Sequence, residues 1–346
     1  MSKLAPVKFL GFPLFNRSSK RSTAQQPRSQ PYSKTKHQSK HRGKFVLMMG
    51  LSALMLIGSG TYWYVFVAGV PQLDAPEVTV VKDLEFETRS FNSKAMGSDR
   101  RYGLVLPPGY NPKAKTRYPV IVLLHGGHGD ERDYQKRAAL TMVLHRLYRE
   151  KKLPPSIVVT PDGNDSRGSS PFWDPQYYNG PNGKIASLIS DDLVNEIKSH
   201  YKVLGHPRYW AIGGLSSGGW GAVNIGMRRL DRFNVFFSHT GYFQDPNGSA
   251  QNPITAVDRI EPHLRSRLHV YLDAGQNDQV YLDATREFNE KLQNIGISTE
   301  FRVFPGGHGI VGADSGWNYW NKHLHDSLTY VGKRFRDPDM TSMVNP

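Results

Sequence analysis

Apolar residues are grouped along this chain in two different ways. From Phe45 to Leu73 no charged residue occurs, and the part of this run that ends at Phe66 would span about 33 Å as a helix. After it, short apolar segments alternate between the spacing of a strand and that of a helix. The first pattern predicts a helix long enough to cross a bilayer. The second predicts a domain in which strands and helices alternate.

The alternating part covers residues 77–346. Several predicted strands, such as Val120–Leu124, are continuously apolar, which is typical of a parallel sheet covered on both faces. Strands that alternate with helices predict a doubly wound α/β sheet, and this sheet should be mixed because the opening strands follow one another directly. The predicted strands are Glu77–Val81, Leu84–Phe91, Arg101–Leu106, Pro119–Leu124, Ser156–Thr160, Tyr209–Gly213, Val235–Ser238, His269–Leu272 and Glu300–Phe304. The predicted helices are Asp130–Glu150, Ile185–Tyr201, Gly218–Leu230, Tyr281–Ile295 and Gly316–Phe335.

Charge divides the chain into segments. Residues 1–44 hold 11 of the 44 Lys and Arg residues and no acid, and they lack the apolar periodicity of a packed element. We therefore expect a disordered basic tail over 1–44, a membrane anchor over 45–69, a linker over 70–76 and a folded domain over 77–346. After the tail the chain is nearly balanced, with 33 basic and 30 acidic residues, so we predict no nucleic-acid partner.

The apolar run has the features of a retained signal anchor. Tyr62, Trp63 and Tyr64 cluster at its far end, where aromatic rings favour the membrane interface. The basic tail predicts a single-pass protein of the cell membrane, with its N-terminus in the cytoplasm and the domain after about residue 70 on the other side. A cleaved signal peptide, a buried core helix and an organellar transit peptide are the alternatives.

The segment Gly214-Leu-Ser-Ser-Gly218 stands between a predicted strand and a predicted helix. In this context Gly-x-Ser-x-Gly indicates a nucleophilic serine on a sharp turn, because neighbours without a Cβ let the strand and the helix approach each other. Such a turn would project the hydroxyl of Ser216 into solvent. An ordinary structural turn is the alternative.

A serine nucleophile needs a base, and the base needs an acid that orients it. Two Gly-containing loops after predicted strands supply candidates, Asp278 in the first and His308 in the second. Both would lie beyond the carboxyl ends of strands, where open α/β sheets build their sites. Asp273, at a strand end, and Asp283, at a helix start, are rival acids. Most other histidines stand on helix or turn patterns.

Backbone N–H groups should stabilise the oxyanion of such a reaction. Ser217, the residue after the nucleophile, would supply one. The loop after Val120–Leu124 would supply the other, with Gly127 as the first choice and Gly126 as the second. His125 and His128 in that loop lack further ligands at a metal-binding spacing, so we predict no metal site. Without cysteine, the chain has no disulfide, thiolate ligand or thiolate nucleophile.

These residues give the chain a resemblance to the putative-esterase family of α/β-hydrolases. That family includes S-formylglutathione hydrolases, feruloyl and acetylxylan esterases, enterochelin esterases and mycolyltransferases. The resemblance implies an α/β-hydrolase fold, a triad of Ser216, Asp278 and His308, and no cofactor; Ser217 stands where methionine is most usual. The matching segments, in family order, are Arg101–Tyr110, Val122–Gly127, Thr160–Gly163, Asp192–Tyr201, Ile212–Ala222, Gly275–Asp278 and Gly307–His308.

The substrate is the least constrained feature. Trp173, Trp220 and Tyr242 follow strand ends or flank the serine and are candidates to line an aromatic or carbohydrate cleft, with packing roles as the alternative. We expect a membrane-anchored serine esterase that hydrolyses a small-molecule, glycan or lipid ester. The alternatives are an acyltransferase of the mycolyltransferase type, which uses the same acyl-enzyme, and a non-catalytic envelope binding protein with this fold. Further aromatic candidates are Tyr177, Tyr178 and Phe243.

Overall fold

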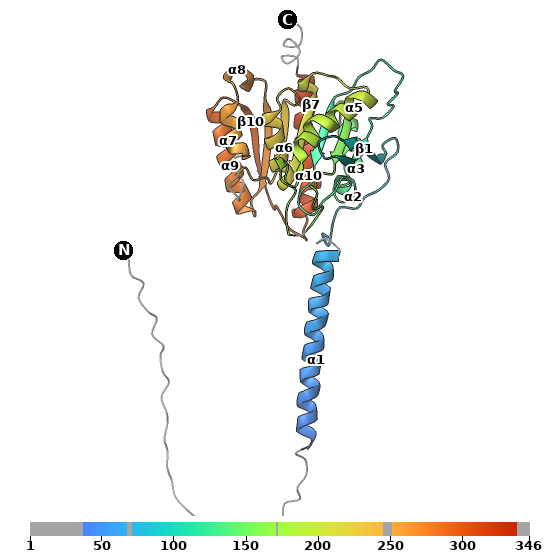
Figure 1. Ribbon diagram of the computed structural model, residues 1–346, viewed down its shortest axis with the longest axis vertical. Coiled ribbons are helices and arrows are strands. Elements are labelled where there is room, and N and C mark those ends of the chain that lie inside the picture. Colours follow the sequence, from blue (N-terminus) through green and yellow to red (C-terminus); the bar gives the residue numbers. More distant parts are fainter. Residues whose placement is uncertain (1–36, 68–70, 171, 245–250, 338–346) are drawn as a thin grey trace, which may run out of the picture. The chain divides into compact units, whose positions relative to one another are not determined.

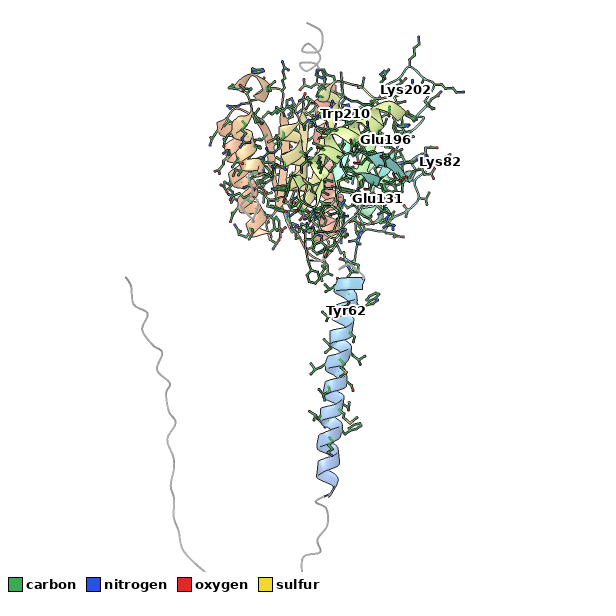
Figure 2. All side chains as sticks on the ribbon, viewed as in Figure 1. Tyr62, Lys82, Glu131, Glu196, Lys202 and Trp210 are labelled. Carbon is green, nitrogen blue, oxygen red and sulfur yellow. The ribbon has the colours of Figure 1, made fainter. Side chains whose placement is uncertain are left out.

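The predicted anchor forms a long helix. A computed structural model describes residues 37–67, 71–170, 172–244 and 251–337; the chain divides into two units, Met1–Ile57 and Gly58–Pro346, each described by itself. Helix α1, His37–Tyr62, continues into a π-helical turn, η1, Trp63–Val67 (Figure 1). Within the described residues, Gly43–Val65 is long and apolar enough to cross a membrane, and its side chains, Tyr62 among them, are largely exposed (Figure 2).

Helix α1 begins before residue 45, where the sequence predicts the start of the anchor. Residues 37–44 are helical, because once the apolar turns have formed, each added polar residue gains a backbone hydrogen bond at little cost. The rest of the predicted tail, residues 1–36, lies outside the described residues.

The centre of the second unit is an eight-stranded sheet with the order β1-β2-β4-β3-β7-β8-β9-β10 (Figure 1). The pairs β1–β2 and β2–β4 are antiparallel and all the others are parallel, which confirms the prediction of a doubly wound, mixed sheet. The strands are β1 Phe86–Ser93, β2 Ser98–Val105, β3 Val120–Leu124, β4 Ile157–Pro161, β7 Trp210–Leu215, β8 Val235–His239, β9 His269–Gly275 and β10 Ser298–Phe304, with a separate ribbon of β5 Asn179–Gly180 and β6 Gly183–Lys184.

Helices cover both faces of the sheet. Along β3, Val122 contributes to the apolar cluster on one face, and Ile121 and Leu123 contribute to the cluster on the other. α6 and α9 pack on the first face, and α3 and α10 pack on the second (Figure 1). The helices are α2 Asp133–Lys136, α3 Leu140–Arg149, α4 Ile185–Ser187, η2 Leu188–Leu193, α5 Val194–His200, η3 Pro207–Tyr209, α6 Ser217–Arg228, α7 Pro253–Ala256, η4 Val257–Arg259, α8 Pro262–Arg265, α9 Gln279–Asn294 and α10 Gly316–Arg336.

Two predicted elements are wrong. Glu77–Val81 is extended but forms no strand of the sheet, since only an isolated bridge from Val81 to Leu84 is present. The helix predicted over Asp130–Glu150 is interrupted between α2 and α3, because Ala139 adopts a left-handed conformation with φ 48°. The apolar spacing of Glu77–Val81 therefore does not mark a buried strand, since Val78 and Val80 are exposed. In the second segment the buried residues belong to two helices, α2 and α3, and not to one.

The sheet topology determines where a site can form. The chain adds β4 on one side of β3 and β8 on the far side of β7, so the strand order switches direction between β3 and β7. In such sheets the carboxyl ends of the strands at the switch leave a crevice for a ligand. The loop after β3 and the turn after β7 meet there, because Leu124 pairs with Gly214 at the strand ends.

Candidate active site

Ser216 stands on a strained turn between β7 and α6. Its backbone has φ 53° and ψ −123°, a conformation that non-glycine residues rarely adopt. Its N–H donates to the carbonyl of His239 at 2.9 Å, and its carbonyl accepts from the N–H of Trp220 at 3.1 Å. A Cβ on Gly218 would overlap the carbonyl of Leu124, so glycine is required at this crossing. The turn places a half-buried Ser216 at the N-terminus of a helix.

Asp278 and His308 form a close pair on neighbouring loops. The Asp278 carboxylate lies 2.5 Å from Nδ1 of His308 and accepts a second hydrogen bond from its backbone N–H at 2.6 Å. Burial acts to raise the pKa of Asp278, but the hydrogen bonds and charge of His308 outweigh it and lower that pKa. Gly307, with φ 141°, leaves room for the carboxylate. This pair would orient an imidazole and stabilise its protonated form.

Tyr281 links the pair to Ser216. Its ring stacks on the imidazole of His308 with 4.2 Å between centroids. Burial raises the pKa of Tyr281, and the nearby side chain of Ser216 acts against that rise. The indole of Trp320 contacts the same imidazole edge-on, at 5.3 Å. Within the described residues Nε2 of His308 is buried and makes no hydrogen bond, so it is the ring nitrogen available to take a proton. Sequence reasoning missed Tyr281, although an aromatic residue three positions after a candidate acid was a usable signal.

The loop after β3 lies against the serine turn. A Cβ on Gly126 would lie 3.4 Å from Cβ of Ser216, whereas one on Gly127 would overlap the carboxylate of Asp174. Of the two glycines predicted as oxyanion donors, Gly126 therefore lies beside Leu215 and Ser216. Gly127, the first choice, lies against Asp174. Ser217 opens α6, where the first N–H groups have no partner within the helix.

Asp174 adds a carboxylate that the sequence did not reveal. Partial desolvation raises its pKa, and the imidazoles of His128 and His308 oppose that rise. His125 has a structural role: its Nδ1 lies 2.8 Å from the carbonyl of Gly126, and its Nε2 accepts from Gly163 at 2.9 Å. Among the described residues, no group of His, Asp or Glu is arranged to hold a metal ion.

The comparisons agree on one family. Residues 93–331 match the family model described as "Putative esterase". The chain belongs to the putative esterase family. An uncharacterized protein of Corynebacterium glutamicum is 22% identical, over 76% of this chain and 64% of that protein. An esterase of Mycobacterium tuberculosis is 27% identical, over 63% of this chain and 54% of its own length. A solved ferulic acid esterase is 26% identical, with a TM-score of 0.65, and the match covers 73% of this chain and 99% of that one.

The likeness confirms the predicted α/β-hydrolase fold. The chain spans less than two thirds of the length of these two curated relatives.

The three aromatic residues predicted to bind substrate have different surroundings in this esterase-family fold. Trp220 is only 3% exposed and stacks on Tyr242 at 6.3 Å, so it is mainly a packing residue. Tyr242 is partly exposed and contacts Tyr281 at 6.5 Å, which connects it to the site. Trp173 is partly exposed, donates to the carbonyl of Gly168 at 3.1 Å and precedes Asp174 in the loop beside Gly127.

A second Ser–His–Asp set lies in the core of the esterase-family domain. His239 is 2.5 Å from Asp273 and 3.0 Å from the hydroxyl of Ser327. All three are buried, and the Ser327 hydroxyl also donates to the carbonyl of Leu324 at 3.2 Å. Asp273, a rival acid in the sequence, is therefore engaged away from His308, and it accepts a further hydrogen bond from Tyr319.

Proposed function

We propose that this protein is a membrane-anchored serine esterase. The observation that carries the proposal is the Asp278–His308 pair, on which the ring of Tyr281 stacks while lying near Ser216. Family membership and the likeness to a ferulic acid esterase support ester cleavage at this site.

The proposed reaction gives each of these residues a defined role. Nε2 of His308 removes the proton of Ser216 as Oγ attacks the ester carbonyl, and Asp278 stabilises the imidazolium. The N–H of Ser217 and one from the Gly126–Gly127 loop stabilise the oxyanion. The C–O bond to the alcohol then breaks, and His308 returns the proton to the leaving alcohol. Water attacks the acyl-enzyme by the same route, giving the free acid and the original Ser216 hydroxyl.

The proposed substrates are esters with a short acyl or an aryl acyl group. The partly exposed rings of Trp173 and Tyr242 lie on segments that adjoin the site and support an aromatic or carbohydrate-bearing substrate. Water is the proposed acceptor. Product analysis by mass spectrometry, with and without added sugars, should give free acid as the main product. A predominance of sugar ester would instead indicate an acyltransferase with the same triad.

Anchoring by α1 is part of the proposal. The helix is long and apolar enough to span a bilayer, and the basic residues before it favour a cytoplasmic N-terminus. The domain after it would then act on the extracytoplasmic side.

Covalent labelling tests the nucleophile and the enzyme class together. A fluorophosphonate should label the protein once, at Ser216, and Ser216→Ala should remove the label. The same substitution should lower the rate of ester hydrolysis by a factor on the order of 10⁴. Ser327→Ala is the matched control, since it removes the serine that contacts the buried His239–Asp273 pair. This variant should still be labelled. Labelling that persists in Ser216→Ala would refute the assignment.

A further inference from the structure

The segment that follows the anchor is hydrogen-bonded to the loop that carries His308. The side chain of Gln72 donates to the carbonyl of Ser315 at 3.1 Å and accepts from the N–H of Trp317 at 2.5 Å. The N–H of Leu73 donates to the carbonyl of Ile310 at 2.8 Å. Asp74 adds two contacts: its carboxylate accepts from Gly312 at 2.8 Å, and its carbonyl accepts from the side chain of Asn318 at 2.9 Å.

The residues that bind this docked segment lie close to His308 along the chain. The loop folds back on itself, since Gly307 donates to the carbonyl of Asp314 at 3.0 Å and Gly316 donates to that of Gly307 at 2.8 Å. Ile310, which bonds to Leu73, is two residues after His308. From the end of η1 at Val67 to Gln72 there are five residues, which reach at most about 18 Å when extended. The length of the chain therefore limits how far Gln72, which is bonded to the His308 loop, can lie from Val67.

Large apolar side chains are exposed around this loop. Leu73 is 68% exposed, Ile310 43% and Val311 58%. Val280, two residues after Asp278, and Phe172, two before Asp174, are exposed as well. Beyond the anchor, the other large apolar side chains exposed among the described residues are Val78, Val80 and Val303. Five of these eight residues thus adjoin the proposed site. Single apolar residues scattered over a surface need no explanation, but a cluster beside a site does.

We propose that Leu73, Phe172, Val280, Ile310 and Val311 form a membrane-contact patch, and that the cleft takes amphiphilic esters presented at the bilayer surface. The inference rests on the proposed function and names the substrate class of that site. A short tether that docks beside the catalytic loop brings the patch to the lipid and gives a lipid-borne ester a high effective concentration. A water-soluble ester gains nothing from the tether. The patch contacts the lipid surface, because the docked segment that carries Leu73 directly follows the membrane anchor in the chain.

Site-directed labelling tests the membrane contact without relying on activity. The chain has no cysteine, so Val311→Cys carries a single environment-sensitive fluorophore in the full-length protein, reconstituted in phosphatidylcholine vesicles. Val303→Cys is the matched control, an exposed valine on β10 outside the patch. The label at 311 should be quenched by nitroxide-bearing lipid and the label at 303 should not. Equal quenching, or a label at 311 shielded only by a second copy of the chain, overturns the proposal.

Two acetate esters test the substrate class. One is nitrophenyl acetate. The other is the same ester with a hexadecyl chain on the ring, held in the vesicles. In the variant Ile310→Ser/Val311→Ser the ratio of the amphiphilic to the soluble rate should fall about tenfold, because two apolar contacts with lipid are lost. Val303→Ser should leave that ratio unchanged. An unchanged ratio in the patch variant refutes the inference alone. If the wild-type protein hydrolyses neither ester, the proposed function is refuted.

Discussion

Asp278 follows a strand and immediately precedes α9, a position where aspartate ordinarily caps the helix. Its side chain makes no capping bond and turns to His308 instead. The residue type alone is therefore ambiguous, and the partner decides the role. A carboxylate with two hydrogen bonds to one histidine fixes both the tautomer and the orientation of the ring.

Replacing that carboxylate should stop turnover while leaving the fold intact. Asp278→Asn should lower kcat by roughly 10⁴-fold with little change in KM, because an amide favours the wrong histidine tautomer. Steady-state kinetics on a short nitrophenyl ester measure both constants. Asp283→Asn, an exposed carboxylate on the first turns of the same helix, should be close to wild type. Our loop assignment is wrong if the two variants exchange these results.

A buried histidine far from this chemistry should make stability depend on pH. Burial lowers the pKa of His269 from its usual value near 6.5 to about 4. Between these values the unfolded chain binds a proton that the folded chain does not, so the free energy of unfolding falls as the pH is lowered from 7 toward 4. The group's contribution to this loss is at most roughly 3 kcal/mol.

Denaturant unfolding in detergent at pH 7 and pH 5 checks this dependence. His269→Gln should lose about 2 kcal/mol less than the wild type over that range, because the titrating group is gone. His263→Gln, at an exposed position in α8, should keep the wild-type dependence. An unchanged pH dependence in His269→Gln would show that another group is responsible.

At the scale of elements, the site depends on how closely two loops approach each other. β9 and β10 are parallel and end side by side, with Gly275 paired to Phe304. A Cβ on Gly275 would overlap the backbone of Gly306 and Gly307, so the two loops meet without side chains between them. This approach brings Asp278, after β9, to His308, after β10.

A methyl group at that contact should damage both stability and activity. Gly275→Ala should lower the free energy of unfolding by about 2 kcal/mol, since backbone must move to admit it. It should also lower kcat by separating Asp278 from His308. Gly205→Ala adds a methyl with no atom within 4 Å and should change stability by less than about 0.5 kcal/mol. Calorimetry and kinetics on both variants make the comparison; equal effects would mean that the close approach is not what matters.

The elements that sequence predicts well are those with a strong local signal. Val120–Leu124 is continuously apolar and forms β3, which ends at Leu124 as predicted. Gly214–Gly218 forms the predicted turn. Glu77–Val81 has strand-like alternation but no strand to pair with, which only tertiary structure decides. The docking of Gln72 beside His308 joins residues more than 200 positions apart, and a short polar linker carries no local sign of it.

At the scale of the whole molecule, the arrangement of charge and apolar length predicts a topology. The basic residues before α1 should remain in the cytoplasm and the sheet domain should lie outside. Since the chain has no cysteine, Ser33→Cys in the tail and Ser98→Cys at an exposed position in β2 can be labelled one at a time. In intact cells with a permeable outer layer, an impermeant maleimide should label only the cysteine at position 98. Labelling at position 33 would indicate the opposite orientation. A mature chain that begins after residue 60 would exclude a retained anchor.

The buried contacts of His239 with Asp273 and Ser327 have a consequence for the recognition of active sites by shape. A search for Ser–His–Asp geometry by interatomic distance would find this core set, since both of its links are short, at 2.5 and 3.0 Å. Yet solvent never reaches Ser327, and its proton is held by a helix carbonyl. Access to solvent distinguishes the proposed site at Ser216 from this buried set, and a covalent inhibitor should therefore bind with a stoichiometry of one per chain.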